Sequence, residues 1–160
     1  MVRKAVAGEA EVLARLALEM WTDNTLGGLT DEFERLTLDD DAACFIKYVD
    51  RDPFSFADGN PAGYEDRIPV GFAQCGLRRD YVEGTDSSPV GYLEGIFVLD
   101  GYRKLGYARE LLSACEQWAR EKGCTEFASD CELCNEGSLH FHLAAGFDEA
   151  NRIICFVKKL

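Results

Sequence analysis

Long apolar runs are missing from this chain. Among its 160 residues, no apolar stretch approaches the roughly eighteen consecutive residues that a membrane-spanning helix needs. The N-terminal segment carries Glu9, Glu11, Arg15 and Glu19, which leaves no uninterrupted apolar stretch of the kind found in secretory signal peptides. We therefore expect no membrane partner and no export from the cell.

Positive charge is also scarce. The chain has 17 lysines and arginines against 29 aspartates and glutamates, so its formal net charge is −12. Such a surface repels phosphate backbones, and we expect no nucleic-acid partner. It attracts polycationic small molecules, although many cytosolic proteins are acidic without binding any.

Motifs for metals and for the commonest phosphate sites are absent as well. The chain has neither G-x-x-x-x-G-K-[ST] nor G-x-G-x-x-G. Cys131 and Cys134 form one C-x-x-C pair without a second pair at zinc spacing, so we expect free thiols and no bound metal. His140 and His142 are two residues apart on an expected helix and point in different directions. We expect structural or solvent-facing roles for both.

Cysteine is plentiful, with seven residues. An odd number, lying mostly within apolar runs, is typical of buried free thiols. Together with the missing signal peptide, this predicts a cytoplasmic protein in a reducing compartment.

The length and the 47% apolar content favour one domain over residues 1–160. Period-two and helical spacing predict ten elements. Thr30 is the expected N-cap of the second helix, and Gly123 and Gly146 follow the last two helices. Turn residues predict loops at 51–67 and 80–89. The predicted strands are 2–6, 42–49, 68–77, 90–99, 124–129 and 153–158, and the predicted helices are 10–21, 30–38, 103–122 and 135–145.

The order of these elements indicates how the sheet is built. The strand–helix–strand unit from 90 to 129 predicts a right-handed parallel crossover, and the earlier strands predict antiparallel pairing. We therefore expect an α/β protein of the α+β kind, with a central, mixed, mostly antiparallel sheet and helices on both faces.

The segment Gly101-Tyr-Arg-Lys-Leu-Gly-Tyr-Ala108 joins the strongest strand to the strongest helix. The first turn of a helix has unpaired N–H groups and a partial positive charge, which can hold a pyrophosphate. Gly106 and Ala108 are small enough to let a phosphate approach the backbone, and Arg103 and Lys104 add positive charge. A helix start that simply needs a glycine is the alternative.

In this context Arg103-x-x-Gly106-x-Ala108 resembles the acetyl-CoA motif of the GNAT superfamily of acetyltransferases. The segments 81–90, 93–99 and 124–130 resemble the aminoglycoside 6′-N-acetyltransferases more closely, as do the endings Gly146-Phe147 and 155–159. The resemblance covers residues 70 to 160 well and the N-terminal third loosely. It implies a GNAT fold, acetyl-CoA as cosubstrate without a metal, a polycationic amine substrate and a homodimer, for which the apolar segment 153–157 offers an interface.

The resemblance also implies which residues form the site. The residues that would hold coenzyme A are the backbone of Ile96, Phe97 and Val98, the turn Arg103, Lys104, Leu105, Gly106, Tyr107 and Ala108, and Asn135. The residues that would contact the acceptor are Trp21, Tyr81, Glu94, Asp130 and Asn151. Asn151 departs from the family, because relatives commonly carry glutamate there. The 51–67 loop is also longer than the family pattern.

The chemistry requires a base, because an amine is protonated near neutral pH and an ammonium is not nucleophilic. We expect Glu94 or Asp130 to bind the amine and accept its proton, directly or through water. A strand break or bulge beside Gly95 would open the ladder there. A backbone N–H near Phe97 or Val98 is the expected donor to the thioester oxygen, and attack is direct, without an acetyl-enzyme.

Each of these residues also has a structural interpretation. Trp21 continues an apolar helix face, Tyr81 lies in a loop, Glu94 could be an outer-face polar residue, and Asp130 could cap a turn. Two other functions fit the pattern: acetylation of another primary amine, such as a polyamine, a small metabolite or a protein N-terminus, and acyl-CoA sensing without catalysis.

Overall fold

A five-stranded sheet forms the centre of the computed structural model, which describes residues 1–50 and 67–160. Its strands lie side by side in chain order. The first four pair antiparallel, and the fifth joins the fourth in parallel. This confirms the expected mixed, mostly antiparallel sheet. The strands are β1 (Val2–Lys4), β2 (Ala42–Asp50), β3 (Arg67–Arg78), β4 (Val90–Val98) and β5 (Phe127–Ser129).

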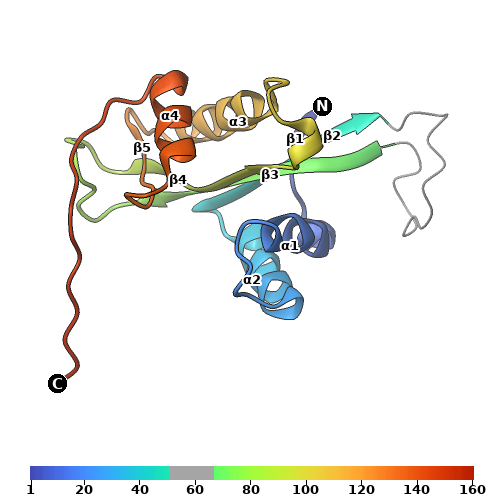
Figure 1. Cartoon of the computed structure of the whole chain (residues 1–160), viewed down its shortest axis with the longest axis horizontal. Coiled ribbons are helices and arrows are strands. Elements are labelled where there is room, and N and C mark those ends of the chain that lie inside the picture. The colour runs from blue at the N-terminus through green and yellow to red at the C-terminus, as the bar shows by residue number, and fades with distance from the viewer. Residues whose placement is uncertain (51–66) are drawn as a thin grey trace.

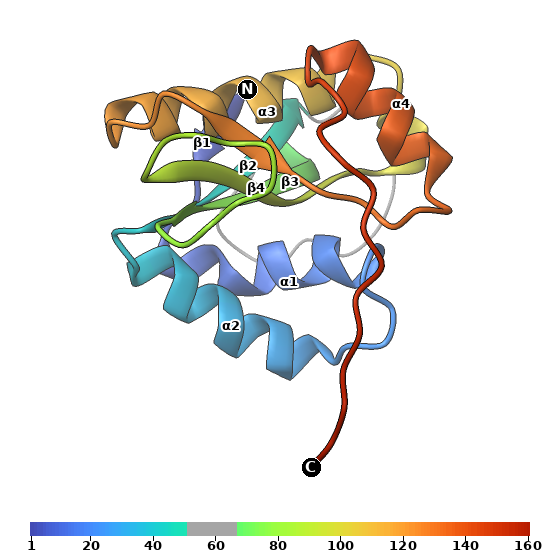
Figure 2. The ribbon, with the colours of Figure 1, turned by 90° about the vertical axis from the view of Figure 1, so that its left-hand side faces the viewer.

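Helices cover both faces of the sheet (Figures 1 and 2). The helices α1 (Ala10–Leu18) and α2 (Leu26–Leu38) lie on one face. The helices α3 (Tyr107–Glu121) and α4 (Glu136–Ala145) lie on the other. Because α3 connects β4 to β5, it is the crossover that parallel neighbours require.

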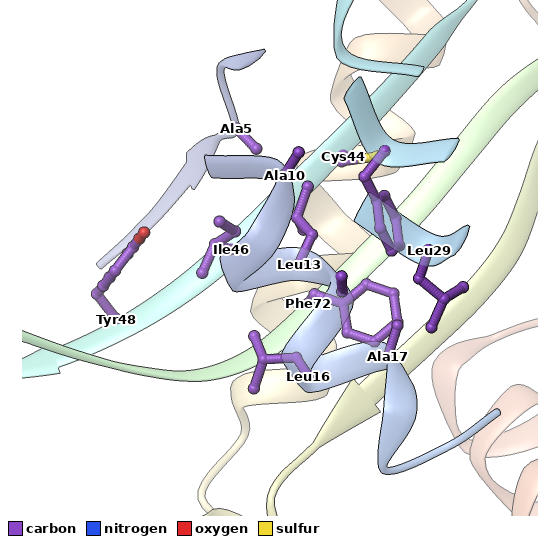
Figure 3. Close-up of a cluster of buried hydrophobic side chains, with 12 residues drawn as sticks. Ala5, Ala10, Leu13, Leu16, Ala17, Leu29, Cys44, Ile46, Tyr48 and Phe72 are labelled. Carbon is purple, nitrogen blue, oxygen red and sulfur yellow. The ribbon is translucent and has the colours of Figure 1, made fainter. Parts of the chain in front are cut away.

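Two apolar layers hold the helices to the sheet. On the α1 and α2 face, Leu13 and Leu29 pack in one cluster with Ile46 and Phe72 (Figure 3). On the α3 face, the helix buries the stripe that its sequence period predicts, which is Leu111, Leu112, Cys115, Trp118 and Ala119. Because apolar side chains are buried on both faces of the sheet, the register of each strand is fixed: a shift by one residue would turn its side chains to the opposite face.

Two helices begin several residues away from the expected positions. The second helix begins at Leu26, and the side chain of Thr25 accepts a hydrogen bond from the N–H of Gly28 at 3.2 Å. Thr30 is not the cap, because its hydroxyl donates to the carbonyl of Leu26. The third helix begins at Tyr107 instead of Arg103.

The C-terminal strand expected at 153–158 is absent from the described chain. Residues 147–160 have no regular secondary structure. Phe147 still packs against Phe127 of β5, and the end of the chain then extends away from the sheet (Figures 1 and 2). A strand needs a neighbour to pair its backbone groups, and this tail lies beside none. Its apolar side chains are therefore exposed, with 92% of Phe156 and 97% of Val157 accessible.

The loop expected at 51–67 lies outside the described residues, except Arg67, which begins β3. The loop expected at 80–89 is free of helix and strand. Within 1–50 and 67–160, the helices are all too short or too polar to cross a bilayer.

Candidate active site

A β-bulge places Glu94 out of the ladder between β3 and β4. Gln74 pairs with Gly95 and Cys75 pairs with Leu93, so Glu94 is the extra residue between them. A bulge bends its strand and redirects the side chain. The side chain of Glu94 is consequently about one-third accessible, whereas its neighbours Tyr92 and Leu93 are buried.

Beyond Leu93 the strands β4 and β5 separate. β5 pairs with β4 only through Gly91, Tyr92 and Leu93. A cavity of about 1060 Å³ borders the rest of β4. Its lining includes Ile96, Phe97 and Val98. No strand of the described chain pairs with this edge of β4, to which Ile96 and Val98 turn their backbone groups, whereas those of Phe97 face Phe72 of β3.

The turn before α3 lines the same cavity. Gly106 has a φ of +83°, in the left-handed region, and a Cβ there would meet no atom within 4 Å. The next residue, Tyr107, begins the helix, so the first N–H groups of α3 have no intrahelical acceptor. Arg103 is held by its Nε, which donates to the carbonyl of Val98 at 3.0 Å, and by an ion pair with Asp100. The cavity thus has a helix N-terminus with basic side chains in its wall.

Both candidate carboxylates also line the cavity, and each has a partner behind it. Arg78 donates to Glu94 through Nε and Nη2 at 2.9 to 3.3 Å. The hydroxyl of Tyr92 donates to Asp130. Burial and this hydrogen bond raise the pKa of Tyr92 far above its usual range, so the phenol stays protonated and remains a donor.

Trp21 reaches the cavity from the segment after α1. A Cβ at Gly95 would lie 2.9 Å from Cζ2 of Trp21 and 3.0 Å from Cε of Met20, so both side chains pack on that glycine. The Trp21 ring also meets Phe72 edge-on, with centroids 5.9 Å apart. Trp21 is therefore both part of the packing and part of the cavity wall, beside Glu94.

Three of the expected site residues do not line the cavity. Leu105 is exposed at the turn. Tyr81 and Asn151 both donate to Glu83, at 3.0 and 2.9 Å. The other twelve expected residues do line it: Trp21, Glu94, Ile96, Phe97, Val98, Arg103, Lys104, Gly106, Tyr107, Ala108, Asp130 and Asn135.

Comparison with known proteins identifies the family of this site. The profile of the acetyltransferase (GNAT) family matches residues 13–147. The chain belongs to this family. It is 37% identical to an aminoglycoside N(6′)-acetyltransferase type 1 from Stenotrophomonas maltophilia, over 97% of this chain and 90% of that protein. It is 47% identical to the protein of that name from Salmonella typhimurium over 94 residues, which are 59% of this chain and 65% of the relative.

Solved GNAT structures share the whole fold. The aminoglycoside acetyltransferase AAC(6′)-Iy, in complex with a bisubstrate analogue of CoA and acetylneamine, superposes with a TM-score of 0.83 at 34% identity, covering 100% of this chain and 98% of that one. AAC(6′)-Ih from Acinetobacter baumannii superposes with a TM-score of 0.84 at 30% identity and the same coverage.

This GNAT cavity also contains a histidine that sequence reasoning set aside. His142 on α4 lines it, with Nε2 3.0 Å from Oγ of Ser129 and Nδ1 2.7 Å from the carbonyl of Ser138. Ser129 in turn donates to the carbonyl of Leu93 at 3.1 Å. His142 thereby links α4 to β5 at the cavity wall, and no local sequence signal distinguishes it from His140.

Proposed function

We propose that this chain transfers an acetyl group from acetyl-CoA to the 6′-amine of aminoglycosides. One observation carries the proposal: a single cavity is lined both by the basic turn at the start of α3 and by the carboxylates of Glu94 and Asp130. The first is suited to a diphosphate and the second to an ammonium. The relatives named as aminoglycoside N(6′)-acetyltransferases support the choice of acceptor.

The residues around the α3 turn fit the coenzyme. Open N–H groups at the start of α3, together with Arg103 and Lys104, would hold the pyrophosphate. The edge of β4 from Ile96 to Val98 has no strand beside it in the described chain and would pair with the amide groups of the pantetheine arm, although the carbonyl of Val98 already accepts from Arg103. Asn135 is the N-cap of α4 and accepts from the N–H of Ser138 at 3.0 Å, so its remaining amide hydrogens could donate to the coenzyme.

On the acceptor side, the two carboxylates supply what an ammonium requires. They attract the cation, and either can accept its proton, directly or through water, before the neutral amine attacks the thioester. The backbone N–H of Val98 would donate to the thioester oxygen as negative charge develops on it, because the N–H of Phe97 faces β3. Trp21 would complete the acceptor wall. Tyr81 and Asn151, which are joined through Glu83 outside the cavity, would contact only the outer part of a larger acceptor.

A thiol-release assay tests this function. Acetyl-CoA is supplied with a panel of aminoglycosides that carry a 6′-amine, matched scaffolds with a 6′-hydroxyl, and linear polyamines. We expect free thiol only with the 6′-amines, and the acetylated product is located by NMR. Turnover of polyamines alone would favour acetylation of another amine. Coenzyme binding without turnover on any amine would favour an acyl-CoA sensor.

We also propose that residues 1–160 form one domain and that two copies associate in a reducing, cytoplasmic compartment. Seven free thiols support the compartment. The exposed apolar tail supports the dimer, since Ile153, Ile154, Phe156 and Val157 are 65 to 97% accessible in one copy and exposed apolar side chains in a row mark contact surfaces.

A further inference from the structure

Behind the two carboxylates lies a second pair of side chains, Arg78 and Tyr92. Arg78 is the last residue of β3, and Tyr92 lies in β4. The guanidinium carbon of Arg78 is 3.4 Å from the centroid of the Tyr92 ring, which is a stacked cation–π contact. Neither residue is in the lining of the cavity.

Each member of this pair binds one carboxylate of the site. Arg78 reaches both oxygens of Glu94, at 2.9 and 3.1 Å from Nη2. Tyr92 donates to Asp130. The stacking therefore connects Glu94 on the bulge of β4 with Asp130 at the end of β5 through one contiguous set of contacts.

A glycine on β3 leaves space for these contacts. Across the β3–β4 ladder, Gly76 is opposite Tyr92. A Cβ at Gly76 would lie 4.0 Å from Oε1 of Glu94, so the carboxylate lies over the glycine. A larger side chain there would fill the space in which Arg78 meets Glu94.

We propose that Arg78 and Tyr92 are positioning residues that hold Glu94 and Asp130 together as one binding site for a single acceptor ammonium. This inference rests on the proposed function, because it assumes that the amine binds at these carboxylates. Charge supports it: two carboxylates and one guanidinium leave one net negative charge, which one ammonium neutralises. Arg78 is suited to the task because its planar fork fixes a carboxylate in orientation, which a lysine does not.

The test compares Arg78→Gln, Tyr92→Phe and the double variant. We expect each single variant to raise the KM for a 6′-amino aminoglycoside roughly tenfold or more, the usual effect of removing a hydrogen bond to a charged group. The Kd for the aminoglycoside, measured by calorimetry without acetyl-CoA, should rise in parallel. The KM for acetyl-CoA should not change. Arg78→Lys keeps the positive charge but lacks the planar guanidinium, so its loss of acceptor binding should be smaller than that of Arg78→Gln but not absent.

Non-additive effects of the two substitutions are the specific sign that Arg78 and Tyr92 support the acceptor site together. If the pair acts as one, the double variant loses less than the product of the two single losses, although the residues touch different carboxylates. Arg79→Gln is the matched control. It removes the same charge from the next residue, whose partner is Asp41 outside the cavity lining, and it should leave acceptor binding unchanged.

Three results would overturn the inference. Tighter aminoglycoside binding in Arg78→Gln would mean that Arg78 competes with the substrate for Glu94. Equal increases of both KM values, or strictly multiplicative losses, would mean that the pair does not act on the acceptor site as a unit. All three results require a wild-type enzyme that acetylates the aminoglycoside. If the wild type neither binds nor acetylates any aminoglycoside, the proposed function itself fails.

Discussion

Glu94 and Asp130 present their carboxylates to one cavity but have different partners behind them. Glu94 faces a guanidinium, whereas Asp130 accepts from a neutral phenol. The guanidinium neutralises part of the charge on Glu94 and acts less strongly on Asp130, whose hydrogen-bond partner is the neutral phenol. Asp130 therefore presents the stronger field to an approaching ammonium.

Removal of either charge should impair the acceptor reaction. We expect Glu94→Gln and Asp130→Asn each to lower kcat/KM for a 6′-amino aminoglycoside by about 10²- to 10⁴-fold, the range for loss of a general base. Steady-state kinetics with both substrates varied checks this. Glu11→Gln, on the exposed face of α1, is the control and should match the wild type. If both site variants kept nearly full activity, the assignment of these carboxylates would be wrong.

Another carboxylate, that of Glu9, contributes to the stability of the folded state. It is 1% accessible and accepts from Arg3 at 2.6 Å and from Tyr48 at 2.5 Å. Burial raises its pKa, but these hydrogen bonds, with one from the N–H of Val6, lower the pKa by more, and the net shift is downward. The ionised form is thus favoured in the folded state. Its contribution is present above the unfolded value near 4.5 and is lost as the pH falls through the lower folded value.

Glu9→Gln should therefore lower the free energy of unfolding at pH 7 by about 1.5–3 kcal/mol, the range for hydrogen bonds to a charged group. The difference from the wild type should shrink as the pH falls from about 4.5 towards the lower folded pKa of Glu9, because the stabilisation is lost in that interval. Urea unfolding at a series of pH values measures both effects. Glu11→Gln removes an exposed pair with Arg15 and should cost less than about 0.5 kcal/mol. A pH-independent difference for Glu9→Gln would contradict the interpretation.

At the scale of elements, the start of α3 depends on one backbone conformation. Gly106 has a φ of +83° with open space around it, so an alanine would be strained by its backbone and not by a clash. That conformation costs a residue with a Cβ about 1–2 kcal/mol. Relief of the strain would turn the first N–H groups of the helix away from the cavity.

Gly106→Ala should raise the KM for acetyl-CoA several-fold and leave the KM for the aminoglycoside nearly unchanged. Calorimetry with coenzyme A gives a second measurement of the same effect. Gly101→Ala is the control, because it also meets no atom within 4 Å and its φ is not in the positive range. Equal effects of the two variants, or an effect on the acceptor alone, would argue against a phosphate site at this turn.

At the scale of the whole molecule, the tail presents the most extended run of exposed apolar side chains among the residues that the structure describes. Phe156 and Val157 are almost fully accessible, and the tail leaves the domain instead of folding back on it (Figure 2). Exposure of apolar side chains to water is unfavourable by about 25 cal/mol per Å² of apolar surface. A second copy that covers the tail would remove that cost.

Phe156→Asp should therefore shift the protein from dimer to monomer. Analytical ultracentrifugation over a range of concentrations measures the change. Leu38→Asp places the same charge on another exposed apolar residue, at the end of α2, and should leave the oligomeric state as in the wild type. A wild-type protein that sediments as a monomer at all concentrations would exclude the dimer.

Local periodicity was enough to place most of the elements. The buried stripe of α3 and the strand character of β4 depend on residues within a few positions of one another, so the order of side chains reports them directly. The start of α2 is one exception: Thr30 is the expected cap, but the cap is Thr25, and Gly27 and Gly28 lie inside the first turn of the helix. Packing of Leu29 and Phe33 in the core compensates for the weak propensity.

What the sequence determined by itself was the class of fold, the family, and the turn from Arg103 to Ala108, because short-range patterns encode all three. Tertiary structure alone decided which distant side chains meet. Arg78 pairs with Glu94 across 16 positions, and Tyr92 pairs with Asp130 across 38. Strand register and the bulge at Glu94 set those pairings. Register depends on which whole face of the sheet is buried, and a short segment of sequence does not contain that information.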